Sequence, residues 1–240
     1  MPFTKHGLRE IVLATLVLGG AAGLVGWWFW PGAIPFVLVW LWVLWFFRDP
    51  PRHGRFGPGE LCAPADGTVT EVSELTDHDA IGGPAIRIGI FLSLIDVHVN
   101  RSPCAGRVRS LSYERGEFLD ARHPESGKRN ECNALVIDPA APMPGPVEVR
   151  QVAGLVARRI ICTVKVAEHL DTGSRIGMIK FGSRTELIIP KLAATEVAVR
   201  VGDKVRGGLT VMARQPIHET APSGVRHTGG LQEGQIATSR

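Results

Sequence analysis

The sequence predicts a mainly β protein, in which a β-rich sandwich or barrel-like domain follows an N-terminal hydrophobic α-helical hairpin in a membrane. Two observations support this prediction. Long apolar runs and the six tryptophans lie before Arg48, whereas the chain beyond it alternates short β-branched runs with Gly, Pro and Asp. We therefore divide the 240 residues into a membrane-anchoring hairpin over residues 1–48, a β-rich domain over residues 49–214 and a flexible tail over residues 215–240.

The first apolar stretch is long enough to cross a bilayer. Residues 11–30 carry no charge over about twenty positions, the length that a helix needs to span the hydrocarbon core. A second uncharged stretch over residues 33–47 reaches only about 22 Å as a helix, so it either crosses a thinned bilayer or re-enters it. Basic residues flank this region and its central turn is uncharged, so the positive-inside rule predicts an inner-membrane protein with its domain on the cytoplasmic side. A cleavable signal peptide fits less well, because its apolar region would be shorter.

Composition argues against several other classes of protein. The net charge is only +4, and the basic residues do not interleave with aromatic ones, so we expect no nucleic-acid partner. Cys62, Cys104, Cys132 and Cys162 are far apart and form no Cys-x-x-Cys pair, so the sequence predicts neither a metal site nor a redox motif. We interpret them as reduced thiols; two disulfides in an exported domain are the alternative.

Short runs of β-branched residues, bounded by Gly, Pro or Asp, predict the strands of the domain. Two windows, residues 92–98 and 166–170, show enough helical periodicity for a turn or two. Asp and Gly at residues 64–67 and 201–205 predict tight turns between strands. The strands are predicted at residues 67–72, 85–92, 106–113, 134–138, 147–153, 159–164, 175–181, 186–190 and 196–201.

Three short motifs place a hydroxyl, an imidazole and a carboxylate among these strands. A Gly-Ser step alone is usually a turn, Asp66 before glycine is an ordinary turn former, and His98 between two valines is compatible with a core histidine. Together, these residue types can supply a nucleophile, its base and the group that orients the base. Asp96 competes with Asp66 for the orienting role if its segment is extended. The motifs are Ala63-Pro64-Ala65-Asp66-Gly67, Asp96-Val97-His98-Val99-Asn100-Arg101 and Phe181-Gly182-Ser183-Arg184.

With these motifs in this order, the sequence resembles the phosphatidylserine decarboxylase proenzyme family, especially its short prokaryotic form, from Phe47-Arg48-Asp49-Pro50 to about Val205. The resemblance implies a carboxy-lyase of phospholipid biosynthesis that converts phosphatidylserine in the membrane to phosphatidylethanolamine. It also implies autocatalytic cleavage between Gly182 and Ser183 into a β chain of residues 1–182 and an α chain of residues 183–240. Ser183 would then become a covalent pyruvoyl cofactor.

The roles that the resemblance implies agree with elementary chemistry. A serine hydroxyl becomes a strong nucleophile only when a base takes its proton, so His98 would be the base for Ser183 and Asp66 would orient it. Gly182 has no Cβ to obstruct the attack and tolerates a strained backbone. The pyruvoyl carbonyl would take up the amine of the substrate and act as an electron sink, and His98 would return a proton to the resulting carbanion.

The residues that would bind the substrate are less clearly marked. Longer bacterial members of the family carry a second histidine where this chain has Arg101, whose guanidinium is suited to the lipid phosphate. The segment around Asn130, Glu131 and Asn133 resembles the family's substrate loop, and a charged surface loop is its alternative interpretation.

Two other functions compete with this hypothesis. A membrane-bound serine peptidase or hydrolase would use Ser183 with His98 or Lys180, and it requires an intact chain with an exposed hydroxyl. A non-enzymatic carrier or scaffold domain would neither cleave itself nor hold a carbonyl cofactor. The expected partners are the membrane lipid and the α and β chains of one precursor, and the sequence leaves open whether the protein forms a homo-oligomer.

Overall fold

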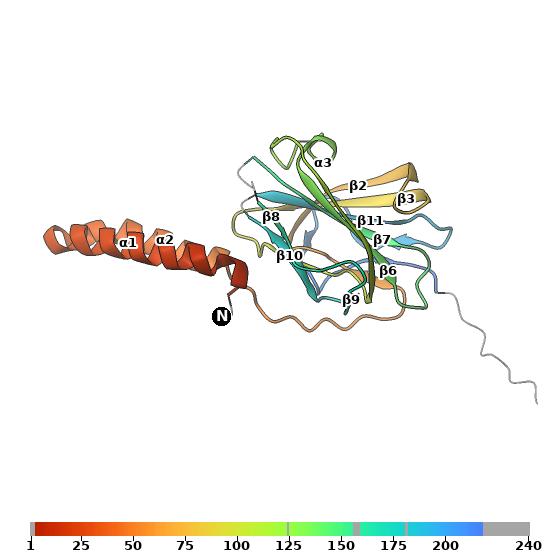
Figure 1. Cartoon of the computed structure of the whole chain (residues 1–240), viewed down its shortest axis with the longest axis horizontal. Coiled ribbons are helices and arrows are strands. Elements are labelled where there is room, and N and C mark those ends of the chain that lie inside the picture. The colour runs from red at the N-terminus through yellow and green to blue at the C-terminus, as the bar shows by residue number, and fades with distance from the viewer. Residues whose placement is uncertain (1–2, 124, 156–158, 181, 218–240) are drawn as a thin grey trace, which may run out of the picture.

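A computed structural model describes residues 3–123, 125–155, 159–180 and 182–217 of the chain. A helical hairpin at the N-terminus projects from a domain built of strands (Figure 1). The predicted mainly β fold with an apolar N-terminal helix is therefore confirmed. Residues 218–240, which form most of the predicted tail, lie outside the described residues.

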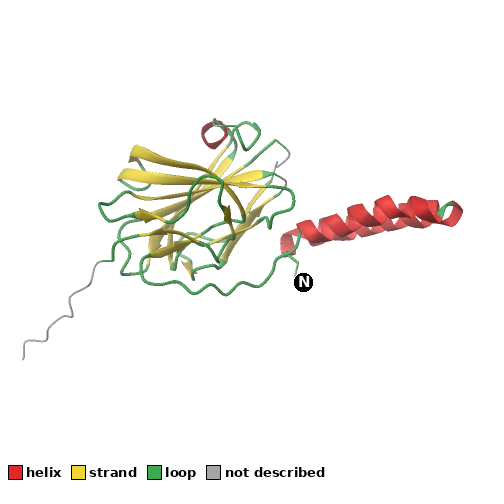
Figure 2. Ribbon diagram, turned by 180° about the vertical axis from the view of Figure 1, so that it is seen from behind, coloured by secondary structure: helices red, strands yellow, loops and turns green. Residues whose placement is uncertain are grey.

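The hairpin consists of two helices that lie side by side and leave the domain together (Figures 1 and 2). Trp40 Nε1 joins them by donating a hydrogen bond to Thr15 Oγ1 at 2.9 Å. The segment Lys5–Trp28 is long and apolar enough to cross a membrane. The second helix has 13 residues and reaches only about 20 Å, which is shorter than a bilayer core. The elements are η1 (Lys5–Gly7), α1 (Leu8–Trp28), η2 (Trp30–Ala33) and α2 (Ile34–Phe46).

One antiparallel sheet of eight strands forms the main body of the domain, in the order β13-β2-β3-β11-β7-β6-β5-β9. The strand β11 lies in the middle and pairs with β3 on one side and β7 on the other. The strands are β2 (Gly67–His78), β3 (Gly83–Leu92), β5 (Gly106–Glu114), β6 (Cys132–Pro139), β7 (Val147–Val152), β9 (His169–Leu170), β11 (Ser183–Pro190) and β13 (Lys204–Val205).

Two three-stranded sheets complete the domain, and a four-residue helix, α3 (Ser126–Arg129), lies in the connection between β5 and β6. The first small sheet has the order β4-β10-β8, and the second has the order β1-β14-β12. Their strands are β4 (Val99–Arg101), β8 (Ile160–Cys162) and β10 (Arg175–Ile179), then β1 (Glu60–Cys62), β12 (Glu196–Val197) and β14 (Val211–Arg214).

The alternation of side chains along β3 and β11 explains where the core forms. Ile88, Ile90 and Leu187 belong to the main hydrophobic cluster and are fully buried. Arg184 and Glu186 alternate with these positions and therefore point to the opposite face of the sheet. Burial of such apolar side chains stabilises the fold by roughly 1.5–3 kcal/mol each.

The structure corrects some details of the sequence prediction. Neither residues 92–98 nor residues 166–170 form a helix; the first segment is a turn that Asp96 closes by accepting hydrogen bonds from Ser93, and the second runs into β9. The predicted tail begins too early, because Gln215 is buried and its backbone N–H donates to Gly59 O at 2.8 Å. The four cysteines are free thiols, as expected.

Candidate active site

The Gly-Ser step lies where the chain enters the central strand β11. Ser183 is the first residue of this strand, pairs with Leu92 of β3 and is fully buried. Its hydroxyl oxygen has no hydrogen-bond partner among the described residues. Gly182 has a φ of +62°, a left-handed conformation that favours glycine. The strand therefore fixes the serine, and the backbone bends sharply just before it.

The carbonyl of Gly182 packs against the backbone of Gly154. A Cβ placed on Gly154 would lie 2.0 Å from Gly182 O and 3.3 Å from the Ala121 side chain. Asn130 holds the neighbouring residue, because its Nδ2 donates to Ala153 O at 2.8 Å. The sequence carries no signal for Gly154, because a glycine that follows a predicted strand resembles an ordinary turn residue.

His98 supplies a buried ring nitrogen next to β10. Its backbone O accepts a hydrogen bond from Ile179 N at 3.4 Å, and its Nδ1 lies 3.0 Å from Asp96 O. Because a carbonyl oxygen can only accept, Nδ1 carries the proton and Nε2 keeps a free lone pair in the neutral ring. That Nε2 is buried and has no partner among the described residues. Burial lowers the pKa of His98 to about 4, so the ring is neutral near pH 7.

Aromatic side chains from the end of the helical hairpin cover this histidine. The rings of Phe46 and His98 have centroids 4.3 Å apart. Phe46 and Phe47 form a small buried cluster with Met178 of β10, and Trp42 packs against it. The candidate site therefore lies at the junction of the apolar hairpin and the β domain, and its hairpin side is apolar.

Asp66 lies near His98 but has other partners. Both of its carboxylate oxygens accept hydrogen bonds from Arg52, the second at 2.7 Å, and Gly207 N donates to it at 2.8 Å. Among the described residues, no hydrogen bond joins Asp66 to His98. The His98 ring is instead oriented by the backbone oxygen of Asp96. An orienting role for Asp66 therefore remains a prediction that requires a rearrangement.

A chain of buried amide side chains lies beneath the serine. Asn100 Nδ2 donates to Thr185 Oγ1 at 3.0 Å, and Gln151 Nε2 donates to Asn100 Oδ1 at 2.8 Å. Asn133 then donates to Gln151 Oε1 at 3.0 Å. Thr185 and Ser183 share one face of β11, so this network supports the strand at the serine. Asn133, predicted to bind substrate, is a member of the network.

The other predicted substrate-binding residues also have internal partners. Arg101 is buried and donates to Asp49 Oδ1 at 2.8 Å and to Gly173 O at 3.0 Å. Asn130 accepts from Leu119 N at 2.9 Å, which fixes the loop over the sheet. Glu131 is half-buried and its hydrogen bond raises the pKa of Tyr113. The side chains of Arg101, Asn130 and Asn133 thus form hydrogen bonds within the protein, and a role for these residues and Glu131 in binding substrate stays a prediction.

A cavity of about 510 Å³ opens beside the Arg101 ion pair, on the side where the chain enters the hairpin. Lys5 and His6 line it from the N-terminal segment, and Arg175 lines it from β10. Arg175 and Arg101 share Asp49 as a partner. Basic groups therefore outnumber the single carboxylate in this cavity.

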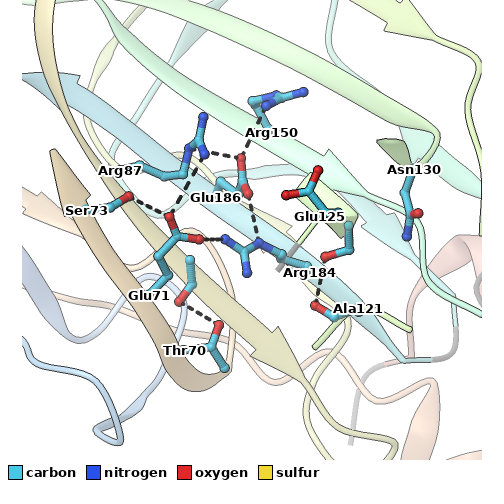
Figure 3. Close-up of polar contacts among 12 residues, drawn as sticks. Thr70, Glu71, Ser73, Arg87, Ala121, Glu125, Asn130, Arg150, Arg184 and Glu186 are labelled. Carbon is cyan, nitrogen blue, oxygen red and sulfur yellow. Dashed lines mark hydrogen bonds and ion pairs between the residues drawn. The ribbon is translucent and has the colours of Figure 1, made fainter. Parts of the chain in front are cut away.

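On the far face of the sheet, an ionic cluster fixes the residue that follows the serine (Figure 3). Arg184 donates to Glu186 Oε1 at 2.8 Å and to Glu71. Glu186 is fully buried and also faces Arg150 at 3.4 Å and Arg87 at 3.7 Å. No sequence motif indicates this cluster, because its members come from four separate strands, β2, β3, β7 and β11.

The amino-acid sequence is similar to that of a known protein family. A sequence model of the family described as phosphatidylserine decarboxylase matches residues 40–213, which include all three motifs. The chain is 45% identical over 216 residues to a phosphatidylserine decarboxylase proenzyme of Rhodopirellula baltica, covering 89% of this chain and 88% of that one. Proenzymes of the same name from Magnetococcus marinus and Symbiobacterium thermophilum are 40% and 46% identical, over 77% and 73% of this chain and 84% and 80% of theirs.

Proposed function

The chain belongs to the phosphatidylserine decarboxylase family, and from this premise we propose that it matures by cutting its own backbone between Gly182 and Ser183. Ser183 then becomes the pyruvoyl group with which the enzyme decarboxylates phosphatidylserine to phosphatidylethanolamine. One observation carries this proposal. Ser183 Oγ and His98 Nε2 are both buried without a partner among the described residues; Ser183 begins the central strand β11, His98 lies next to β10, and a hydrogen bond between Asn100 and Thr185 joins the two segments.

The cut begins with the serine hydroxyl. Ser183 Oγ attacks the carbonyl carbon of Gly182, and its proton passes to His98 Nε2, which holds a free lone pair. The amide nitrogen of Ser183 leaves the carbonyl carbon and takes up a proton, so an ester replaces the peptide bond. A group with a pKa of about 4 is a weak base, so we expect self-cleavage through His98 to be slow.

Loss of the ester completes maturation. Removal of the Cα proton of Ser183 expels the Gly182 carboxylate, and water then releases ammonia, which leaves a pyruvoyl group at the start of the α chain. The full burial of Ser183 and the unpartnered His98 Nε2 fit such a group. The pyruvoyl carbonyl supplies an electron sink for the bond that breaks when carbon dioxide leaves.

His98 serves the decarboxylation by holding and delivering a proton at Nε2. Because the ring is neutral near pH 7, Nε2 first takes up a proton from the ammonium group of the incoming substrate; the lowered pKa then favours return of that proton to the carbon that has lost carbon dioxide. Phe46 and Met178 exclude water around it. Arg101, Asn130 and Asn133 act in this proposal as supports of the site, because each already has internal partners.

The position of the site supports action on a lipid in the membrane. The apolar hairpin covers His98, and the cavity that Lys5, His6 and Arg175 line opens where the hairpin begins. We propose that the lipid phosphate binds at this cavity, since it carries more cationic than anionic side chains. Basic residues at both flanks of the hairpin favour a cytoplasmic domain at the inner membrane. The peptidase alternative needs an exposed hydroxyl, whereas Ser183 is fully buried.

Intact mass spectrometry of the purified chain tests the proposal. Two chains are expected, with the smaller one beginning at residue 183 and lighter than its encoded mass by one ammonia. Ser183→Ala should remain a single chain, and His98→Ala should cut slowly or not at all. Ser174→Ala is the matched control, because Ser174 Oγ is also buried without a partner among the described residues and lies away from the cut. A folded, lipid-supplied wild-type chain that stays whole would refute the proposal.

A further inference from the structure

We propose that the membrane hairpin positions the peptide that is cut, through an ion pair between Glu10 of α1 and Lys180. Lys180 Nζ lies 2.5 Å from Glu10 Oε1, although 170 positions separate the two residues in the sequence. Only two residues separate Lys180 from Ser183. This inference rests on the proposed self-cleavage and adds a positioning pair to it.

Lys180 is buried, so its ammonium group needs a charged partner. The Lys180 side chain is 7% exposed, and Nζ lies 5.7 Å from the centre of the Phe47 ring. Desolvation makes a buried ammonium without a partner unfavourable, so the contact with Glu10 determines where this side chain lies. The backbone is held as well, because Lys180 N donates to Arg159 O at 3.3 Å.

Glu10 is an acidic residue near the start of an apolar helix. It lies near the domain end of a segment, Lys5–Trp28, that is apolar enough to cross a membrane. Its side chain is 34% exposed, and its second oxygen, Oε2, is buried without a partner among the described residues. A carboxylate at this place is costly unless it contacts the domain. The ion pair therefore joins α1 to the chain just before the cut.

The two sides of the scissile bond are anchored differently. After the bond, Arg184 is fixed by Glu71 and Glu186, which both belong to the β domain. Before the bond, the charged anchor belongs to the hairpin, and the same hairpin covers His98 with Phe46. Docking of the hairpin therefore sets both the approach of the carbonyl and the position of the ring nitrogen.

A time course of self-cleavage tests the pair in the full-length chain, synthesised with vesicles that contain phosphatidylserine. Glu10→Gln and Lys180→Met should each cut about tenfold more slowly or worse, which corresponds to about 1.4 kcal/mol in the barrier. The charge-swapped double variant E10K/K180E should recover most of the wild-type rate. Decarboxylation per cut molecule should change less than the cutting rate, which a general loss of structure would not produce.

An exposed pair of the same residue types provides the control. Lys191 Nζ and Glu74 Oε2 are also 2.5 Å apart, with side chains 42% and 67% exposed. Glu74→Gln and Lys191→Met should cut at the wild-type rate. Folding is checked by urea unfolding of each variant in a Ser183→Ala background, where no cutting occurs.

The outcomes separate this inference from the proposal on which it rests. A folded wild-type chain that does not cut overturns the self-cleavage itself, and this inference with it. A wild-type chain that cuts, with both single variants cutting at the same rate, overturns only the positioning role. The positioning role is also overturned if both single variants fail to fold in the Ser183→Ala background, or if a folded E10K/K180E variant cuts no faster than the single variants.

Discussion

Replacing Gly154 by alanine should slow self-cleavage strongly, because the new methyl group collides with the carbonyl that Ser183 attacks. The added Cβ would lie 2.0 Å from Gly182 O, whereas real Cβ contacts are essentially never under 3.0 Å, so the carbonyl or the strand must shift by at least 1.0 Å (3.0 − 2.0). Asn130 holds Ala153 beside it, which favours movement of the Gly182 carbonyl. A misplacement of about 1 Å costs on the order of 100-fold in rate, so we expect an effect of that size.

Pulse synthesis in vesicles, followed by electrophoresis of the precursor and its two products, measures this rate. Gly57→Ala is the control, since its added Cβ would have its nearest neighbour at an ordinary 3.7 Å. Urea unfolding of Gly154→Ala in a Ser183→Ala background separates misplacement from unfolding; overpacking should cost about 1–3 kcal/mol there. A Gly154→Ala chain that cuts within about threefold of the wild-type rate would refute the proposed role of this close contact.

Two further predictions concern buried groups. Burial lowers the pKa of His98 to about 4, below its value in the unfolded chain, so the unfolded chain binds more protons between about pH 4 and pH 6.5. The free energy of unfolding should therefore rise with pH across this window, by about 3 kcal/mol in total, and level off above it. Urea unfolding of the Ser183→Ala precursor measures this dependence. If His98→Gln left the dependence of the unfolding free energy on pH unchanged, His98 would not be its source. Burial raises the pKa of Cys62 and of Cys104 to about 12. Both thiols should therefore resist alkylation by iodoacetamide at pH 8 in the native protein, and the half-exposed Cys162 should be alkylated first. Peptide mass mapping reads out the order, and early labelling of Cys62 would count against the buried position.

Local patterns were enough to predict most elements of the fold. Short runs rich in β-branched residues predict strands at residues 85–92 and 186–190, and β3 and β11 lie at those places. The uncharged run before Trp30 likewise predicts a helix of spanning length, and α1 is long and apolar enough to cross a membrane. Residues 92–98 and 166–170, whose periodicity allowed a helical turn or two, form no helix, because a side-chain hydrogen bond and a strand pairing outweigh the weak periodicity there.

The sequence by itself determined the family, because three motifs in a fixed order, with the Gly182–Ser183 step among them, make a specific combination. Only the tertiary structure decided which partner each charged group has. Asp66 pairs with Arg52, Arg101 pairs with Asp49, and Gly154 packs against the scissile carbonyl. Each of these contacts joins segments that are distant along the chain, and local composition carries no information about which distant segment folding brings near.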